Sequence, residues 1–160
     1  MIYIVMGVSG CGKTTVGKLL SKKLQLPFYD ADNFHPEASI TKMRSGIPLD
    51  DQDRQDWLQT LSSKIIQWEN EGGAVLACSA LKEKYRSILQ SLPPNQISWI
   101  FLKGALPLIS ERLANRRNHF MSASLLQSQF EALEEPAYGI HVPIDDAPEQ
   151  IVQHILKNLV

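Results

Sequence analysis

The feature that most constrains this chain is a glycine-rich loop between a strand-like segment and a helix-like segment. Residues 2–6 form a short apolar run, which is typical of a strand buried on both faces of a parallel sheet. The next residues, Gly7-Val8-Ser9-Gly10-Cys11-Gly12-Lys13-Thr14, match the complete phosphate-loop pattern Gly-x-x-x-x-Gly-Lys-Thr. Residues 14–24 then place apolar side chains at helical spacing. This order predicts a site for the phosphate groups of a nucleoside triphosphate, which we expect to be ATP.

The chemistry of such a loop assigns roles to its residues. Glycines let the backbone curl so that N–H groups point at phosphate oxygens, and the helix N-terminus adds partial positive charge. We expect Lys13 to reach the β- and γ-phosphates, and Thr14 to place its hydroxyl on Mg²⁺. Cys11 is interpreted as a backbone N–H donor, with a redox role as the alternative. The predicted nucleotide-binding residues of the loop are Gly7, Val8, Ser9, Gly10, Cys11, Gly12, Lys13, Thr14 and Thr15.

The rest of the chain alternates short apolar segments with helix-like ones. Strands are predicted at 2–6, 27–29, 74–78, 98–102 and 140–144. Helices are predicted at 14–24, within 33–71 with an interruption at 46–48, at 81–91, from 107, at 125–133 and at 148–159. This alternation predicts an α/β fold of three layers, a five-stranded parallel sheet flanked by helices, formed by residues 1–160 as one domain.

Composition narrows the class of partner and the compartment. Sixteen Lys and Arg oppose seventeen Asp and Glu, giving a net charge of -1, which argues against a nucleic-acid or membrane-surface binder. No apolar run approaches the roughly 20 residues of a membrane span. The two cysteines lack CxxC spacing, so we expect neither a disulfide nor a zinc site. Because the first strand begins almost at Met1, no signal peptide is expected, and the cytoplasm is the expected location.

Two carboxylates follow the second predicted strand, at Asp30 and Asp32. Ligands of open α/β sheets lie at the carboxyl ends of strands, and residues two apart on an extended chain point the same way. One carboxylate could organise Mg²⁺ through water while the other orients an acceptor hydroxyl. The alternative is a helix cap next to a solvated acid.

Further blocks follow in order along nearly the whole chain. They are Asp30-Ala31-Asp32-Asn33-Phe34-His35-Pro36, Lys42-Met43-x-x-Gly46-x-Pro48-Leu49-x-Asp51-x-Asp53-Arg54-x-x-Trp57-Leu58, Cys78-Ser79-Ala80-Leu81-Lys82-x-x-Tyr85-Arg86, Phe101-Leu102-Lys103-Gly104, Arg116-x-x-His119-Phe120 and Gln129-Phe130-x-x-Leu133-x-Glu135-Pro136. Together they resemble the gluconokinase family.

This resemblance implies an ATP-dependent kinase that makes 6-phospho-D-gluconate from D-gluconate. It also implies the nucleoside-kinase-like P-loop fold with a mobile lid, usually as a homodimer. Four positions depart from the expected pattern, namely Cys11, Ala31, Ser39 and Asp56.

Carried onto this sequence, the resemblance gives candidate roles at the acceptor site. Asp32 is the candidate that orients and deprotonates the acceptor hydroxyl, and Asp30 supports Mg²⁺ together with Thr14. Arg54 offers a planar bidentate donor to the gluconate carboxylate, with a surface ion pair to Asp50 or Asp51 as the alternative.

Other basic side chains complete the predicted site. His35 and Lys42 are candidates to bind substrate, and so is Arg86, for which a solvated helix charge is the equal alternative. Arg112 and Arg116 lie where this kinase class has its lid and are assigned to the nucleotide. The predicted catalytic residues are Lys13, Asp32 and Arg116.

Two other functions remain open at this point. Shikimate kinases share the phosphate loop and an Asp-x-Asp pair, but they are expected to carry a glycine triplet where this chain has Ser79-Ala80-Leu81. A nucleotide-switched binding protein would usually hold Mg²⁺ with an acid that ends a strand, and the third predicted strand runs from Cys78 into Ser79 instead.

Overall fold

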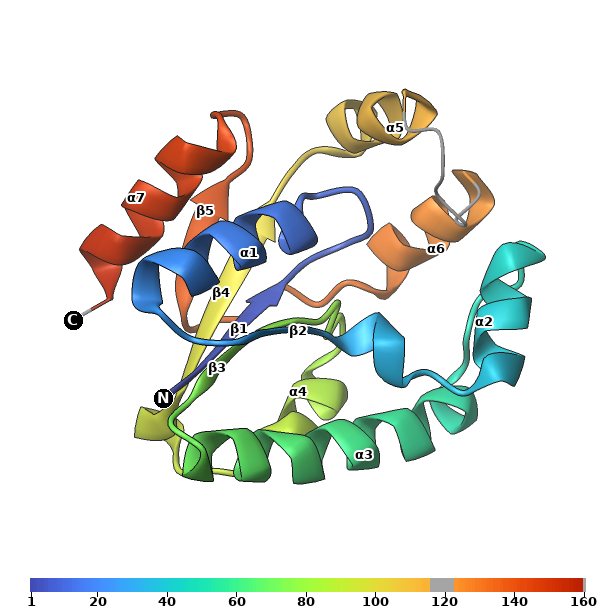
Figure 1. The fold of residues 1–160 in the computed structure, drawn as a ribbon. Helices are drawn as coiled ribbons and strands as arrows, with labels where there is room; N and C mark the ends of the chain where they lie inside the picture. Colours follow the sequence, from blue (N-terminus) through green and yellow to red (C-terminus); the bar gives the residue numbers. More distant parts are fainter. Residues whose placement is uncertain (116–122, 160) are drawn as a thin grey trace.

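The computed structural model describes residues 1–115 and 123–159, and its centre is a five-stranded parallel sheet (Figure 1). The strand order is β2-β3-β1-β4-β5. The strands are β1 (Ile2–Met6), β2 (Phe28–Asp30), β3 (Ala74–Ala77), β4 (Ile97–Lys103) and β5 (Ile140–Pro143). Every pair of neighbours runs parallel, with β1 paired to both β3 and β4. The predicted sheet is therefore confirmed.

The strand order creates a switch point at β1. From β1 the chain moves to β2 and β3 on one side and later to β4 and β5 on the other. In open α/β sheets a crevice forms where the connections diverge in this way, outside the carboxyl ends of the strands. The phosphate loop follows β1 directly, so the topology places it at that crevice.

Helices cover both faces of the sheet, which gives the predicted three layers (Figure 1). On one face α1 (Lys13–Leu24) packs beside α7 (Pro148–Asn158), and on the other α3 (Asp51–Asn70) packs beside α4 (Glu83–Leu89). The remaining helices, α2 (Glu37–Arg44), α5 (Leu106–Ala114) and α6 (Ala123–Ala132), lie beyond the carboxyl ends of the strands (Figure 1).

The core has two main clusters, one on each face of the sheet, because side chains alternate across it, and a small third cluster around Met43 and Leu125. Along β1, Ile4 and Met6 face the cluster that contains the α3 side chains, and Val5 faces the cluster that contains α1 and α7. The three tryptophans, Trp57, Trp68 and Trp99, are all buried in this core.

Helix α3 begins with a capping box between Asp50 and Asp53. The Asp53 N–H donates to Asp50 Oδ1 over 2.8 Å, and the Asp50 N–H donates to Asp53 Oδ2 over 3.2 Å. One turn further on, the indole Nε1 of Trp57 donates to the carbonyl oxygen of Ala31 over 2.8 Å. This bond fixes the segment after β2 against α3.

The structure refines several sequence-based boundaries. Two short 3-10 helices, at Ala31–Phe34 and Pro94–Gln96, were not predicted. The region predicted as mainly helical between 33 and 71 consists of the first of these, α2 and α3. Residues 116–122, which hold most of the predicted lid, lie outside the described residues. Within the described part of the chain, no helix has the length and apolar character needed to cross a membrane.

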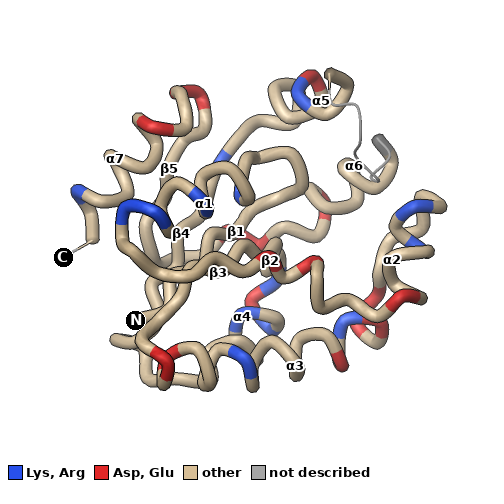
Figure 2. Tube along the Cα trace, viewed as in Figure 1, with Lys and Arg blue, Asp and Glu red and all other residues tan. Residues whose placement is uncertain are grey.

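Charged residues of both signs are interspersed along the Cα trace in Figure 2. Acidic residues follow β2 and begin α3, and basic residues lie on α1, α4 and α5. Residues of opposite charge thus alternate along the chain, in line with the near-neutral net charge.

Candidate active site

The phosphate loop is held in a conformation that needs glycine. Gly10 and Gly12 adopt φ angles of +82° and +97°, a region that side chains with a Cβ rarely occupy. A Cβ on Gly10 would also lie 2.9 Å from Leu113 Cγ of α5. The loop is joined to the neighbouring strand as well, because the Gly7 N–H donates to the Ser79 carbonyl oxygen over 3.3 Å.

The N-terminus of α1 is available to an anion. The helix begins at Gly12, whose carbonyl oxygen accepts from the Val16 N–H over 2.9 Å, and no side chain caps its first turn. No acidic residue lies in that turn either. The free N–H groups and the positive end of the helix dipole are together an anion-binding arrangement.

Lys13 lies across the loop that it terminates. Its Nζ donates to the carbonyl oxygens of Gly7 and Val8, each over 3.0 Å. The ammonium group therefore already occupies the concave side of the loop, where phosphate groups bind in this motif.

The two cysteines are buried, and the pKa of each thiol is raised. Burial raises the pKa of the Cys11 thiol, and the nearby charge of Lys13 opposes only part of that shift. Burial, followed by the charge of Asp32, raises the pKa of Cys78 to about 12. Thiolates rather than thiols are the reactive species, so the geometry favours the non-redox interpretation of Cys11.

Asp30 contacts the phosphate loop directly. Its Oδ2 accepts from the Thr14 hydroxyl over 3.2 Å, and its Oδ1 caps the following 3-10 helix by accepting from the Asp32 N–H over 3.0 Å. Asp30 is therefore a helix cap, as the alternative interpretation expected, and its second oxygen contacts Thr14 as well. A hydroxyl beside a carboxylate is a pair of hard oxygen donors that suits Mg²⁺. Among residues 1–115 and 123–159, no group of three His, Cys, Asp or Glu forms a metal cluster.

The Asp32 side chain is exposed at the edge of the site, beside the buried side chain of His35. The Asp32 side chain is 55% exposed, whereas that of His35 is 3% exposed. His35 Nε2 lies 3.5 Å from Asp32 Oδ1. The imidazole stacks on the Trp57 indole, with ring centroids 4.0 Å apart at an angle of 17°. His35 is thus placed to orient Asp32, and its burial leaves it little surface for a substrate.

The charges around Asp32 keep it ionised. The partial desolvation of the half-exposed Asp32 carboxyl raises its pKa, and the contact with His35 lowers it. The positive charges of Lys13 and Arg54 lower it further, so the pKa lies below its usual range. A carboxylate near both cations joins the phosphate loop to the acceptor side.

Arg54 faces a cavity rather than an acid. Its guanidinium carbon lies 5.3 Å from the Tyr85 ring centroid and 5.9 Å from that of Trp57. Asp50 caps α3, and Asp51 contacts Lys82, Lys84 and Tyr85, so the predicted alternative of an Arg54 ion pair with either acid is wrong. Arg54 lines a cavity of about 200 Å³ with Met43, Pro48, Leu49, Leu81, Lys82, Tyr85, Leu125, Ser128, Gln129 and Ala132.

Lys42 is committed to a structural contact. Its Nζ donates to both carboxylate oxygens of Asp53, each over 2.8 Å. Because Asp53 also closes the capping box of α3, the pair ties α2 to the start of α3. The geometry therefore gives Lys42 a positioning role. Its ammonium group binds Asp53 instead of being left free for a substrate, as the sequence had suggested.

Arg86 requires a correction. The residue is 2% exposed, so the interpretation as a solvated helix charge is wrong. Its Nη1 and Nη2 donate to the carbonyl oxygens of Ala80 and Glu134, each over 2.7 Å. Its Nε donates to Glu83 and Tyr138, each over 3.0 Å. With every guanidinium nitrogen engaged by protein, Arg86 holds the turn after β3, where Ala80 adopts a φ of +43°.

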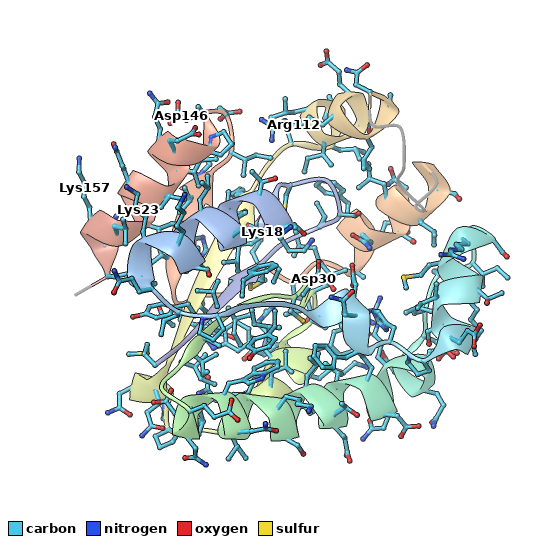
Figure 3. The ribbon with its side chains drawn as sticks, in the orientation of Figure 1. Lys18, Lys23, Asp30, Arg112, Asp146 and Lys157 are labelled. Atoms are coloured by element: carbon cyan, nitrogen blue, oxygen red, sulfur yellow. The ribbon has the colours of Figure 1, made fainter. Side chains whose placement is uncertain are left out.

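The predicted lid residues are only partly within the described chain. Arg112 donates from Nη2 to the Ile144 carbonyl oxygen over 2.8 Å, which ties α5 to the end of β5. Figure 3 labels Arg112 and Asp30, which lie on opposite sides of the phosphate loop in that view. Arg116, the other predicted lid residue, lies outside the described residues.

One residue was not assigned a role from the sequence although its block was noted. Gln129 Oε1 accepts from the Ser9 N–H of the phosphate loop over 2.7 Å. The resemblance marked the block Gln129-Phe130-x-x-Leu133, but nothing in the residue type pointed to a contact with the loop. Tertiary packing alone brings these residues together.

The comparisons with known proteins agree with this geometry. A family model described as shikimate kinase matches residues 9–160. A probable gluconokinase from Dictyostelium discoideum is 41% identical, covering 99% of this chain and 86% of the relative. The thermoresistant gluconokinase of Escherichia coli K12 is 43% identical, covering 98% of this chain and 91% of the relative. The chain belongs to the gluconokinase family.

A solved gluconokinase supports the same membership. The crystal structure of a gluconokinase from Sinorhizobium meliloti 1021 superposes with a TM-score of 0.87 at 37% identity. The match covers 97% of this chain and 89% of that one. The resemblance in the sequence blocks and the predicted P-loop kinase fold are therefore confirmed.

The contacts of Arg86 predict a stability effect. Arg86→Met leaves the Ala80 and Glu134 carbonyl oxygens without donors, so we expect the free energy of unfolding to fall by about 3 kcal/mol. Urea denaturation measures it. The control is Lys84→Met on the same helix, whose contact with Asp51 is exposed and screened by solvent, so its loss should cost far less. Equal stability of the two variants would contradict the structural role.

Proposed function

We propose that this gluconokinase-family chain transfers the γ-phosphoryl group of ATP to the 6-hydroxyl of D-gluconate, giving 6-phospho-D-gluconate and ADP. The observation that carries the proposal is the placement of Asp32. Its exposed carboxylate lies beside His35 and is influenced by both Lys13 of the phosphate loop and Arg54 of the neighbouring cavity. A base between a donor site and an acceptor site is what phosphoryl transfer requires.

On the donor side, the loop and α1 bind the triphosphate. The N–H groups from Gly10 to Thr15 donate to phosphate oxygens, and Lys13 moves from the loop carbonyls to the β- and γ-phosphates. Thr14 and Asp30, whose side chains are hydrogen-bonded to each other, are the residues that would hold Mg²⁺. When bound, Mg²⁺ neutralises charge on the β- and γ-phosphate oxygens.

On the acceptor side, Asp32 receives the proton of the gluconate hydroxyl. The hydroxyl oxygen forms a bond to the γ-phosphorus while the bond to the ADP oxygen breaks. Arg54 binds the gluconate carboxylate with its planar pair of donors, because the rings of Trp57 and Tyr85 orient it and no acid among the described residues forms an ion pair with it. His35 keeps the Asp32 carboxylate in place.

Several further assignments accompany this function. The positive charges of Arg112 and Arg116 stabilise the negative charge that develops on the phosphoryl oxygens. Such electrostatic stabilisation is usually the largest single contribution to catalysis. Residues 1–160 form one kinase domain, since strands from both ends of the chain share one sheet. The enzyme acts in the cytoplasm, in line with two buried free cysteines, and it forms a homodimer as the family resemblance implies.

Shikimate phosphorylation is the alternative that the family model raises. The turn after β3 argues against it. Where a shikimate kinase is expected to carry a glycine triplet, this chain has Ser79-Ala80-Leu81, and Arg86 binds the Ala80 carbonyl oxygen. That turn is therefore held by a buried arginine side chain instead of being formed by flexible glycines.

An acceptor panel tests the proposed function. Purified protein with ATP and Mg²⁺ is assayed for ADP release in the presence of D-gluconate, other aldonates, shikimate or nucleoside monophosphates. We expect release that depends on gluconate and yields one phosphorylated product. Release with shikimate alone would favour the alternative. If no acceptor increased ADP release, a nucleotide-switched binding protein would be favoured.

The role of Asp32 predicts a separation of turnover from binding. Asp32→Asn removes the proton acceptor, so we expect kcat to fall by about 10²- to 10⁴-fold. The Kd of a non-hydrolysable ATP analogue should stay within about twofold, since Asp32 accepts no bond from the loop. Asp56→Asn, an exposed acid on α3, is the matched control. Near-normal turnover of Asp32→Asn would refute the assignment.

The role of Arg54 predicts an effect on the acceptor alone. Arg54→Ala loses charge-assisted bonds to a carboxylate, and we expect the KM for gluconate to rise by about 30-fold while the KM for ATP changes little. Lys64→Ala is the control, because Lys64 is a cation on α3 about 15 Å further along the helix. If Arg54→Ala and Lys64→Ala had equal KM values for gluconate, the contact of Arg54 with the gluconate carboxylate would be ruled out.

A further inference from the structure

Helix α6 touches both halves of the site through one side chain. Gln129 Oε1 accepts from the Ser9 N–H over 2.7 Å, and Gln129 also lines the cavity that contains Arg54. Because a backbone N–H can bond only to an acceptor, the amide orientation is set by chemistry, with the carbonyl oxygen on the loop. The Nε2 group then points elsewhere, with two donors that have no hydrogen-bond partner among the described residues.

The position of α6 is fixed by the segment that follows it. The Glu134 N–H donates to the Leu81 carbonyl oxygen over 2.8 Å, and its side chain accepts from the Glu83 N–H over 2.8 Å. Arg86 binds the Glu134 carbonyl oxygen, and Lys103 pairs with Glu135 at 3.1 Å. The carboxyl end of α6 is therefore anchored to the turn after β3 and to the end of β4, one helical turn from Gln129.

This anchoring makes the Gln129 contact a fixed one. An unanchored helix would follow the loop as the loop changed shape. A helix tied to two strands presents Gln129 at a constant position, against which the Ser9 end of the loop is aligned. Ser9 lies on the part of the loop that Gly7 and Gly10 bracket, so its orientation affects where the following N–H groups point.

We propose that Gln129 is a positioning residue that couples the two substrate sites. Its carbonyl oxygen orients the phosphate loop, and its amide group donates to an oxygen of the acceptor in the cavity beside Arg54. Acceptor binding then holds the Gln129 side chain in the conformation that orients the loop. Occupying either site favours binding at the other, by the same factor in both directions. The acceptor half of this inference rests on the proposed function.

The test measures coupling as well as affinity. The Kd of a non-hydrolysable ATP analogue is measured by calorimetry with and without saturating gluconate. For the wild-type protein we expect gluconate to tighten the analogue by about fivefold or more. For Gln129→Leu that ratio should fall to about one, and the affinity for the analogue alone should weaken by about fivefold, the size of one lost hydrogen bond.

Two further variants separate coupling from general damage to α6. Gln127→Leu alters an exposed glutamine on the same helix whose amide donates to Glu131, with no other partner among residues 1–115 and 123–159, and it should keep the wild-type ratio. Gln129→Asn keeps the amide but is one methylene shorter, so it cannot span the loop and the cavity and should behave as Gln129→Leu does. Thermal unfolding of all variants gives the stability of each.

The outcomes are distinguishable. A wild-type ratio of one, or an unchanged ratio in Gln129→Leu, overturns the coupling even if gluconate is the substrate. If the wild-type protein shows no gluconate-dependent ADP release, the proposed function fails instead. The analogue measured alone then decides the inference, since equal affinity in Gln129→Leu and Gln127→Leu would refute a role of Gln129 on the loop.

Discussion

The rest of this structure depends on a set of backbone N–H groups that no protein side chain satisfies. They open α1, where the phosphate loop leaves the central strand and no cap or acid follows. Unpaired N–H groups at a helix start are costly unless water or an anion binds them. The glycines at 10 and 12 allow the loop to aim these groups, and the close packing of Gly10 on α5 holds the loop in place. Donor binding is thus built into the backbone.

The acceptor side is built differently, through side chains on several elements. One indole organises it, because Trp57 binds the Ala31 carbonyl oxygen and stacks on His35, which in turn contacts Asp32. Charged residues near this group divide into two kinds. Lys42 and Arg86 are bound by protein acceptors and position other groups, whereas Arg54 is held over aromatic rings with its charge available.

Two kinds of contact link the phosphate loop with the cavity beside Arg54 in this small domain. The charges of Lys13 in the phosphate loop and of Arg54 beside the cavity both act on Asp32. Helix α6 adds a mechanical contact between the same two sites, because its carboxyl end is anchored while Gln129 reaches the loop. The electrostatic and the mechanical contacts arise from different elements, and only the folded chain brings them together.

The sequence by itself determined the parallel α/β fold, the phosphate loop and the acid pair after β2. These follow from local rules, namely apolar periodicity, glycine conformation and residue spacing, which act between near neighbours. It did not determine the strand order, the 3-10 helix after β2, or which arginines and lysines are free. Arg54 and Arg86 look alike in sequence, yet one faces a cavity and the other binds Ala80 and Glu134. That difference was decided only by tertiary structure, because the acceptors that occupy a buried cation come from residues distant along the chain.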